Sequence, residues 1–560
     1  MTSSGTLSGS FISRIFSVPT LALSVFFGMV SPSVFAEPPA AVRINHEGIG
    51  GTLILAGGGE IPEAAEKAYV DAIRAASASA EPRVVILPQA SEAPLESGTK
   101  TAEWLTNLGI ANSQISAATE QQPDNLQQTV EQIREAHAVW IGGGQQSRLS
   151  TLFANTQVEA ELKELLKRGG VIGGTSAGAA IMSKTMIASG TSEPELGVGF
   201  DLIPGAIVDQ HFTERDRIHR SRLAVTANPG HFGLGIDEST AVILEKRTLR
   251  VTGKGSVTVL LGPSQHRLAD EFQLKDGGVA DLTQLRRAAL SRASGQNPGE
   301  TKFGKTEVPS GALVIVGGGG MPKPIVDRFL ELAGGPNARI VVLPTAVPRE
   351  EAFRQRVPGF LREASTASIR ILPQSRTEEV ESVEFQDALK DATGVWFGGG
   401  RQWNFVDAYE NTSAVELFRD VLRRGGVIGG SSAGATIQGE FLVRGHPLGN
   451  TVMMAEGYER GFAFLPGSAI DQHFSQRGRK PDLIPVIRRH PDMLGIGIDE
   501  STAIVVQGTN VSVIGDHSAH FLSSKRLPAE SNDEKDSTPE EINALYISIP
   551  SGQHLDLSTL

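Results

Sequence analysis

The chain has 560 residues, of which 40% are hydrophobic and 20% charged, and it carries a formal net charge of −12 and no cysteine. This composition is typical of a soluble globular protein with more than one hydrophobic core, and it excludes a disordered chain or a protein with many membrane spans. The negative charge argues against nucleic acid as a partner, because the phosphates would be repelled. The absence of cysteine excludes a disulfide, a thiolate nucleophile and a cysteine metal ligand.

Residues 1–36 have the pattern of an export signal. Arg14 is their only charge, residues 18–30 are mostly apolar, and Val34-Phe35-Ala36 places small residues where signal peptidase cleaves. We therefore expect cleavage after Ala36, a secreted or periplasmic mature protein, and no membrane contact once the signal is removed. A retained anchor is the alternative, but the apolar run is shorter than the roughly 20 residues of a membrane span.

The rest of the chain contains a tandem repeat with a period of about 260 residues. A repeat of this length is a domain rather than a solenoid unit. Five motifs recur in the same order: LILAGGG at 53–59 and LVIVGGG at 313–319, VVILP at 84–88 and IVVLP at 340–344, VWIGGG at 139–144 and VWFGGG at 395–400, GGTSAGA at 173–179 and GGSSAGA at 429–435, DQHF at 209–212 and at 471–474. We predict domains at residues 44–262 and 309–525, with a linker region at 263–308 and a C-terminal tail at 526–560.

Each copy alternates short β-branched runs that end in glycine with helical patterns, such as residues 158–168. This rhythm predicts an α/β fold, with two tandem doubly wound domains built on mostly parallel sheets. Ligands of such folds bind at the carboxyl ends of the strands, so the glycine-rich turns predict the position of the site.

Ser176 and Ser432 are the predicted nucleophiles, because each occupies the serine position of a Gly-x-Ser-x-Gly elbow. A serine hydroxyl needs a general base near neutral pH, and His211 and His473 follow the elbows at similar intervals, each after a strand-like run. The recurrence of the pair favours a catalytic over a purely structural histidine.

A carboxylate must orient the imidazole, and Glu193 is the predicted residue in the first copy, with Glu195 as the alternative. The matching loop of the second copy has no acidic residue, and Glu456 is the nearest candidate downstream. We therefore expect the first copy to be the better catalyst. The repeated pairs Asp237-Glu238 and Asp499-Glu500 are interpreted as structural turns near the site.

Four arginines follow the two histidines, and guanidinium groups bind carboxylates through two hydrogen bonds. They are candidates for gripping aspartyl groups of a substrate, with a solvated helix face as the alternative: Arg215, Arg217, Arg477 and Arg479.

Together, the GG[TS]SAGA elbow, the [VI]DQHF motif with its arginines and the later GIDEST motif resemble cyanophycinases of the dipeptidase E-like serine peptidases. The resemblance covers nearly all of both copies. It implies a class I glutamine amidotransferase-like fold, a serine–histidine–acid triad, and neither metal nor other cofactor. It also implies a substrate such as cyanophycin, a polyaspartate that carries arginine on its β-carboxyls, or a related acidic or isoaspartyl peptide, with release of β-Asp-Arg dipeptides. By the same resemblance, Gln146 and Gln402 contact substrate, and the oxyanion donors are the N–H groups of Gly58 and Ala177 and of Gly318 and Ala433.

Two other classes of protein remain open from the sequence. An α/β-hydrolase esterase shares the elbow but separates serine and histidine by more residues, and a noncatalytic binding protein could retain degenerate sites. The sequence also leaves open whether the chain forms a homodimer.

Overall fold

A computed structural model describes residues 44–78, 81–119, 123–295, 305–528 and 538–560. Residues 44–560 form one compact unit, which contains both copies of the repeat. The predicted signal at 1–36, with its cleavage point after Ala36, lies outside the described residues and stays a prediction. Among the described residues, no helix has the length and apolar character that crossing a membrane requires.

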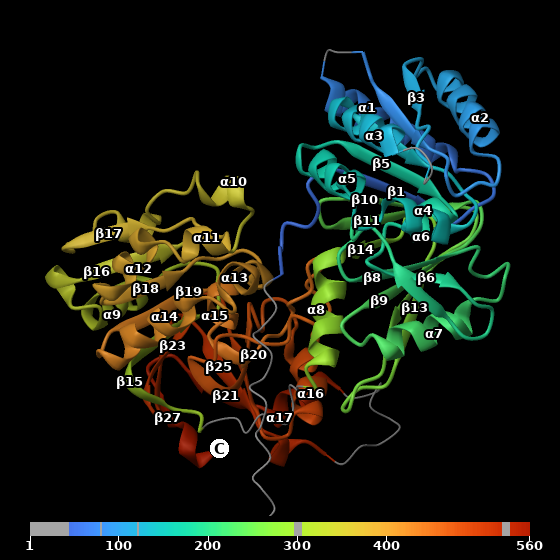
Figure 1. The fold of residues 1–560 in the computed structure, drawn as a ribbon. Helices are drawn as coiled ribbons and strands as arrows, with labels where there is room; N and C mark the ends of the chain where they lie inside the picture. Colours follow the sequence, from blue (N-terminus) through green and yellow to red (C-terminus); the bar gives the residue numbers. More distant parts are fainter. Residues whose placement is uncertain (1–43, 79–80, 120–122, 296–304, 529–537) are drawn as a thin grey trace, which may run out of the picture. The chain divides into compact units, whose positions relative to one another are not determined.

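The first copy is built on an eight-stranded sheet with the strand order β14-β11-β10-β1-β5-β4-β2-β3. Figure 1 labels β1, β3, β5, β10, β11 and β14 of this sheet. From β1 to β3 all neighbours are parallel, whereas β10, β11 and β14 extend the sheet with antiparallel pairs. The strands are β1 (Thr52–Ala56), β2 (Val84–Leu87), β3 (Ser113–Ile115), β4 (Ala138–Ile141), β5 (Val171–Thr175), β10 (Thr240–Glu245), β11 (Thr248–Gly253) and β14 (Val279–Asp281).

Helices cover both faces of this sheet, because the parallel strands are apolar on both sides. Alternate residues of β1 illustrate this: Leu53 and Leu55 belong to one buried cluster, and Ile54 and Ala56 belong to another. The first cluster includes α3, α4 and α5, and the second includes α1 and α2. The helices of the first copy are α1 (Glu63–Ser77), α2 (Pro94–Asn107), α3 (Pro123–Glu135), α4 (Gln146–Phe153), α5 (Gln157–Lys167), α6 (Ala177–Ala180), α7 (Ile218–Ala227) and α8 (Leu282–Ala293). The predicted doubly wound α/β fold is confirmed.

A second, smaller sheet lies beside the first, and the sequence analysis did not predict it. Its strand order is β13-β12-β9-β8, with β8 and β9 parallel and the other pairs antiparallel. The strands are β8 (Ala206–Gln210), β9 (Phe232–Ile236), β12 (Val257–Leu261) and β13 (Asp270–Leu274), and a separate hairpin joins β6 (Thr185–Ser189) to β7 (Glu195–Val198). Since β8 and β9 end near the end of β1, the residues that follow them belong to the same edge of the fold.

The second copy repeats this plan with a large sheet of order β17-β16-β18-β19-β15-β23-β24-β27 and a small sheet of order β20-β21-β22-β25-β26. Its strands are β15 (Val308–Val316), β16 (Arg339–Leu343), β17 (Ser368–Ile371), β18 (Gly394–Phe397), β19 (Val427–Ser431), β20 (Gly439–Phe441), β21 (Leu465–Gln472), β22 (Leu494–Ile498), β23 (Thr502–Gly508), β24 (Asn510–Gly515), β25 (Ser518–Leu522), β26 (Ile547–Pro550) and β27 (His554–Asp556). Its helices are α9 (Lys323–Leu332), α10 (Arg349–Ala352), α11 (Thr377–Val380), α12 (Val383–Lys390), α13 (Gln402–Tyr409), α14 (Ser413–Arg423), α15 (Ala433–Thr436), α16 (Lys480–Arg489) and α17 (Pro539–Leu545).

The predicted ends of the two copies, at residues 262 and 525, are too early. Most of the predicted linker, 263–308, belongs to the first copy, because β13 pairs with β12, β14 pairs with β11, and α8 follows directly. In the same way, the predicted tail 526–560 supplies β26 and β27, which pair with β25 and β24. These additions cover strand edges that would otherwise be unpaired, which is the physical reason why both copies carry them.

Candidate active site

Ser176 lies on a sharp turn between β5 and α6. Its φ of 53° and ψ of −114° are strained for a residue with a side chain, and its N–H donates to the carbonyl of Ala56 at the end of β1 over 2.9 Å. The turn brings α6 so close to β4 that a Cβ added to Gly178 would lie 2.1 Å from the carbonyl oxygen of Ile141. The small residues of the elbow are therefore required by packing, and the serine is held at the carboxyl end of the sheet.

His211 directly follows β8, and its backbone connects the small sheet to the large one. Its N–H donates to the carbonyl of Gly57 over 2.8 Å, and its Nε2 lies 2.8 Å from the Oγ of Ser176. Gly58, with a φ of 116°, allows this approach, because an added Cβ would lie 2.2 Å from Cε1 of His211. The structure thus brings the predicted nucleophile and base into hydrogen-bond contact.

Glu238, not Glu193, is the carboxylate that contacts His211. Its Oε1 lies 2.5 Å from Nδ1, and the residue directly follows Asp237 in the turn after β9. Glu193 is an exposed residue of the loop between β6 and β7, and Glu195 in β7 accepts a hydrogen bond from Ser189. Both glutamates belong to a hairpin that pairs with itself rather than reaching the histidine, so the prediction of Glu193 is wrong.

The second copy has the same chain of contacts. Ser432 has a φ of 57°, its Oγ lies 3.0 Å from Nε2 of His473, and Nδ1 of His473 lies 2.5 Å from Oε1 of Glu500. Glu456, the sequence candidate, instead forms an ion pair with Arg292. The second copy therefore has a carboxylate beside its histidine. We expected it to be the poorer catalyst because it lacked one, and that reason is wrong.

The missed residues, Glu238 and Glu500, carried a signal in the sequence. Both lie in the repeated GIDEST motif, and each follows an aspartate that holds the neighbouring backbone: Asp237 accepts from the N–H of Thr213, and Asp499 from that of Ser475. We expected the carboxylate between serine and histidine, whereas in this chain it follows the histidine.

The electrostatics of the two histidines favour a neutral base. Burial lowers the pKa of His211 below its ordinary value, while the hydrogen bond with Glu238 opposes that shift by stabilising the charged form. The pKa of His473 is lowered in the same way by burial and raised by Glu500. An imidazole that is neutral near pH 7 and has a carboxylate behind it is suited to accept a proton from serine.

Backbone donors surround the nucleophile. The N–H of Ala177 donates no hydrogen bond among the described residues, nor does that of Gly143 after β4. Gly143 lies next to the serine, since an added Cβ would be 3.5 Å from the Cβ of Ser176, whereas Gly58 lies against the histidine ring. We therefore add Gly143, and Gly399 in the second copy, to the predicted oxyanion donors Gly58, Ala177, Gly318 and Ala433.

The two predicted substrate glutamines are buried and their amides are used internally. Nε2 of Gln146 donates to the carbonyl of Ile187 over 2.8 Å, and Nε2 of Gln402 donates to the carbonyls of Val443 and Arg444. Their side-chain amides therefore hold the chain after the elbow, and their contact with substrate stays a prediction.

The four arginines divide into two kinds. Arg217 and Arg479 form ion pairs with the buried Asp209 and Asp471, at 3.2 Å and 3.1 Å, so each has a structural partner, and a contact with substrate stays a prediction for both. Arg215 and Arg477 are exposed, and each lowers the pKa of the neighbouring catalytic histidine through its positive charge, after the larger effect of burial. Their contact with a substrate carboxylate also stays a prediction.

No group of three or more histidine, aspartate or glutamate side chains in the described part of the chain is arranged to hold a metal ion.

The family profile described as peptidase family S51 matches the chain twice, at residues 53–252 and 313–514. The chain belongs to peptidase family S51. It carries two copies of the S51 unit, and it is a serine-type peptidase.

The known proteins to which the chain is similar match about one copy of the repeat. A cyanophycinase of Synechococcus elongatus is 29% identical over 239 residues, which are 41% of this chain and 74% of that protein. A cyanophycinase of Geminocystis herdmanii is 33% identical over 188 residues, 32% of this chain and 69% of that protein. Among solved structures, a peptidase from an acI-B1 actinobacterium matches with 23% identity and a TM-score of 0.36, over 42% of this chain and 98% of that one.

Proposed function

We propose that this S51 peptidase is a serine exopeptidase that hydrolyses cyanophycin or a related acidic or isoaspartyl polymer to dipeptides such as β-Asp-Arg. The observation that carries the proposal is the hydrogen-bonded chain from Ser176 through His211 to Glu238, which recurs as Ser432, His473 and Glu500. The similarity to proteins named cyanophycinase supports the choice of substrate.

The proposed reaction uses each group of the triad once in each half-cycle. Oγ of Ser176 attacks the scissile carbonyl carbon and gives its proton to Nε2 of His211, while Glu238 stabilises the cationic ring. The tetrahedral oxyanion accepts hydrogen bonds from backbone N–H groups such as those of Ala177 and Gly143. The histidine then protonates the leaving amine, and the resulting acyl ester is hydrolysed by a water that the same histidine deprotonates.

The test is hydrolysis of insoluble cyanophycin by the purified chain and by Ser176→Ala, Ser432→Ala and the double variant. We expect release of β-Asp-Arg, identified by mass, from the unaltered chain and from each single variant. The double variant should lose about 10⁶-fold in rate, as a serine protease does when its nucleophile is removed. Hydrolysis that survives in the folded double variant would contradict the triad. Hydrolysis of isoaspartyl peptides but not of cyanophycin would change the proposed substrate to isoaspartyl peptides. No hydrolysis of either would favour a binding protein.

We also propose that the chain is exported to a secreted or periplasmic location. The support is the apolar stretch at residues 18–30 followed by Val34-Phe35-Ala36. N-terminal sequencing of the mature protein from the producing cells should begin at Glu37. An N-terminus at Met1, in a protein recovered only from the cytoplasm, would contradict export.

A further inference from the structure

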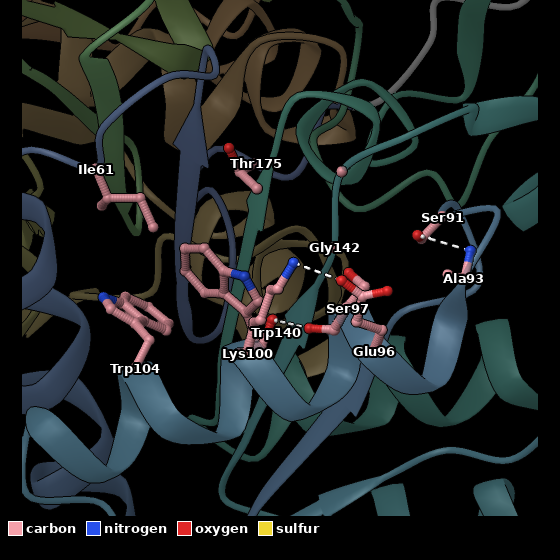
Figure 2. Close-up of a pocket in the computed structure, with 12 residues that line it drawn as sticks. Ile61, Ser91, Ala93, Glu96, Ser97, Lys100, Trp104, Trp140, Gly142 and Thr175 are labelled. Atoms are coloured by element: carbon pink, nitrogen blue, oxygen red, sulfur yellow. Dashed lines mark hydrogen bonds and ion pairs between the residues drawn. The ribbon is translucent and has the colours of Figure 1, made fainter.

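The first copy has two adjoining cavities close to its catalytic residues. One, of about 420 Å³, is lined by Gly143 and Thr175, next to Ser176; the other, of about 850 Å³, is lined by Gly59 and Ser239, next to Glu238. Ile61 and Trp104 line both. Figure 2 shows Trp104, Lys100, Ser97 and Glu96 projecting from α2, with Trp140 beside them. We call this combined space the Trp104 cavity.

The indole of Trp104 is fixed in place. Its Nε1 donates to Oε1 of Glu66 over 2.7 Å, and its ring centroid lies 4.7 Å from that of Trp140. A half-buried tryptophan that is anchored at its polar end offers a stacking face to a ligand, and indole is the aromatic ring that binds a cation best.

The rim of the cavity is acidic. Glu60, Glu63 and Asp276 line the larger part in addition to Glu66, and among the described residues Lys254 is the one basic side chain that lines this part. Lys254 pairs with Glu60 at 3.0 Å, but both side chains are largely exposed, so water screens this pair. Glu63 and Asp276 are also exposed. Besides the Glu60–Lys254 pair, three acidic residues therefore give the larger part of the Trp104 cavity a net negative charge, whereas in the smaller part Glu96 pairs with Lys100 at 2.7 Å.

The second copy has changed both features at the matching positions. Phe360 packs against Trp396 with centroids 4.8 Å apart, as Trp104 packs against Trp140, and Val326 occupies the position of Glu66, so the tryptophan and its anchor have been lost together. The rim positions of Glu60 and Glu63 are Gly320 and Lys323, whereas the position of Lys254 is the acidic Asp516. Lys323 begins α9, where a positive charge opposes the helix dipole, so helix stability does not explain its presence.

We propose that the Trp104 cavity makes the first copy select a cationic side chain on the substrate, and that the second copy lacks this selection. A guanidinium would stack on Trp104 and face Glu63, whereas at the second site it would meet Phe360 and the charge of Lys323. The two copies then differ in substrate preference rather than in catalytic machinery. This inference rests on the proposed function, because it assigns specificity to the same hydrolytic sites.

The test compares two short β-aspartyl oligomers, one that carries arginine and one that carries citrulline, the neutral isostere of arginine. Ser432→Ala isolates the first site and Ser176→Ala the second. At the first site we expect kcat/KM for the arginine substrate to exceed that for the citrulline substrate about tenfold, as a cation on an indole with a nearby carboxylate allows. Glu63→Lys should reduce this ratio to about twofold. Salt at 1 M should also lower the ratio, because the salt shortens the screening length to about 3 Å. At the second site we expect a ratio near one, and Lys323→Glu should raise it.

Glu103→Lys is the matched control, because it makes the same charge change one residue from Trp104 but does not line either cavity. It should leave the ratio unchanged. Equal hydrolysis of both substrates at the first site, or a ratio that Glu63→Lys does not alter, would overturn the inference while leaving the proposed function intact. Failure of both single-site variants to hydrolyse either substrate would instead count against the proposed function.

Discussion

At the scale of single residues, the position of one carboxylate decides how the site works. Glu238 contacts Nδ1 of His211 and leaves Nε2 to Ser176, so it fixes the proton on the side of the ring where it does not compete with the nucleophile. Glu193, with no hydrogen bond or ion pair to His211 in the described part of the chain, has no such influence.

We predict that Glu238→Gln, made in the Ser432→Ala background, lowers kcat by about 10²–10⁴-fold, as loss of the triad carboxylate does in a serine protease. The base acts in its neutral form, and burial lowers the pKa of His211, so activity should fall only as the pH drops through a value below 6.5. Glu238 raises the pKa of His211, so in the variant the remaining activity should fall only at a still lower pH. Steady-state rates measured from pH 4 to 9 check both statements.

Glu193→Gln is the control for this prediction, since it removes the same charge from an exposed loop. It should keep the rate and the pH profile of its parent. A large loss in Glu193→Gln with none in Glu238→Gln would show that the loop closes onto the histidine during the reaction.

At the scale of elements, the elbow works because β5 and α6 approach the neighbouring strand without side chains between them. The strained turn at Ser176 is held by a hydrogen bond to β1 and by the contact of Gly178 with the carbonyl of Ile141. The helix is only four residues long, so its contribution to an oxyanion comes from its free N–H groups rather than from a large helix dipole.

We predict that Gly178→Ala destabilises the protein by about 1–3 kcal/mol or more, because the new methyl group would overlap a backbone carbonyl that cannot move aside. The same shift should displace Ser176 and reduce its labelling by a serine-reactive phosphonate. Thermal unfolding and labelling in the Ser432→Ala background measure the two effects. Gly230→Ala is the control, because its added Cβ would make only an ordinary contact of 3.6 Å with Leu290. Equal behaviour of the two variants would contradict the packing argument.

At the scale of the whole molecule, each copy brings two sheets together to complete one site. The serine follows a strand of the large sheet, whereas the histidine and glutamate follow β8 and β9 of the small sheet, and the same holds for β21 and β22. Because the contacts among serine, histidine and glutamate are equivalent, the copies differ in what surrounds the nucleophile, and substrate preference is the property in which we expect them to diverge.

The sequence by itself determined the tandem repeat, the doubly wound α/β fold, the two serines on their elbows and the two histidines. These features depend on local rules: strand and helix periodicity, and the small residues that a strained turn requires. The tertiary structure decided which carboxylate contacts the histidine, which internal partners Gln146 and Arg217 have, and where the two copies end. Each of these depends on pairing between segments far apart in the chain, such as β9 beside β8 and β13 beside β12. A glutamate in a loop and a glutamate in a turn look alike in sequence, and only the small sheet determines which of them reaches the histidine.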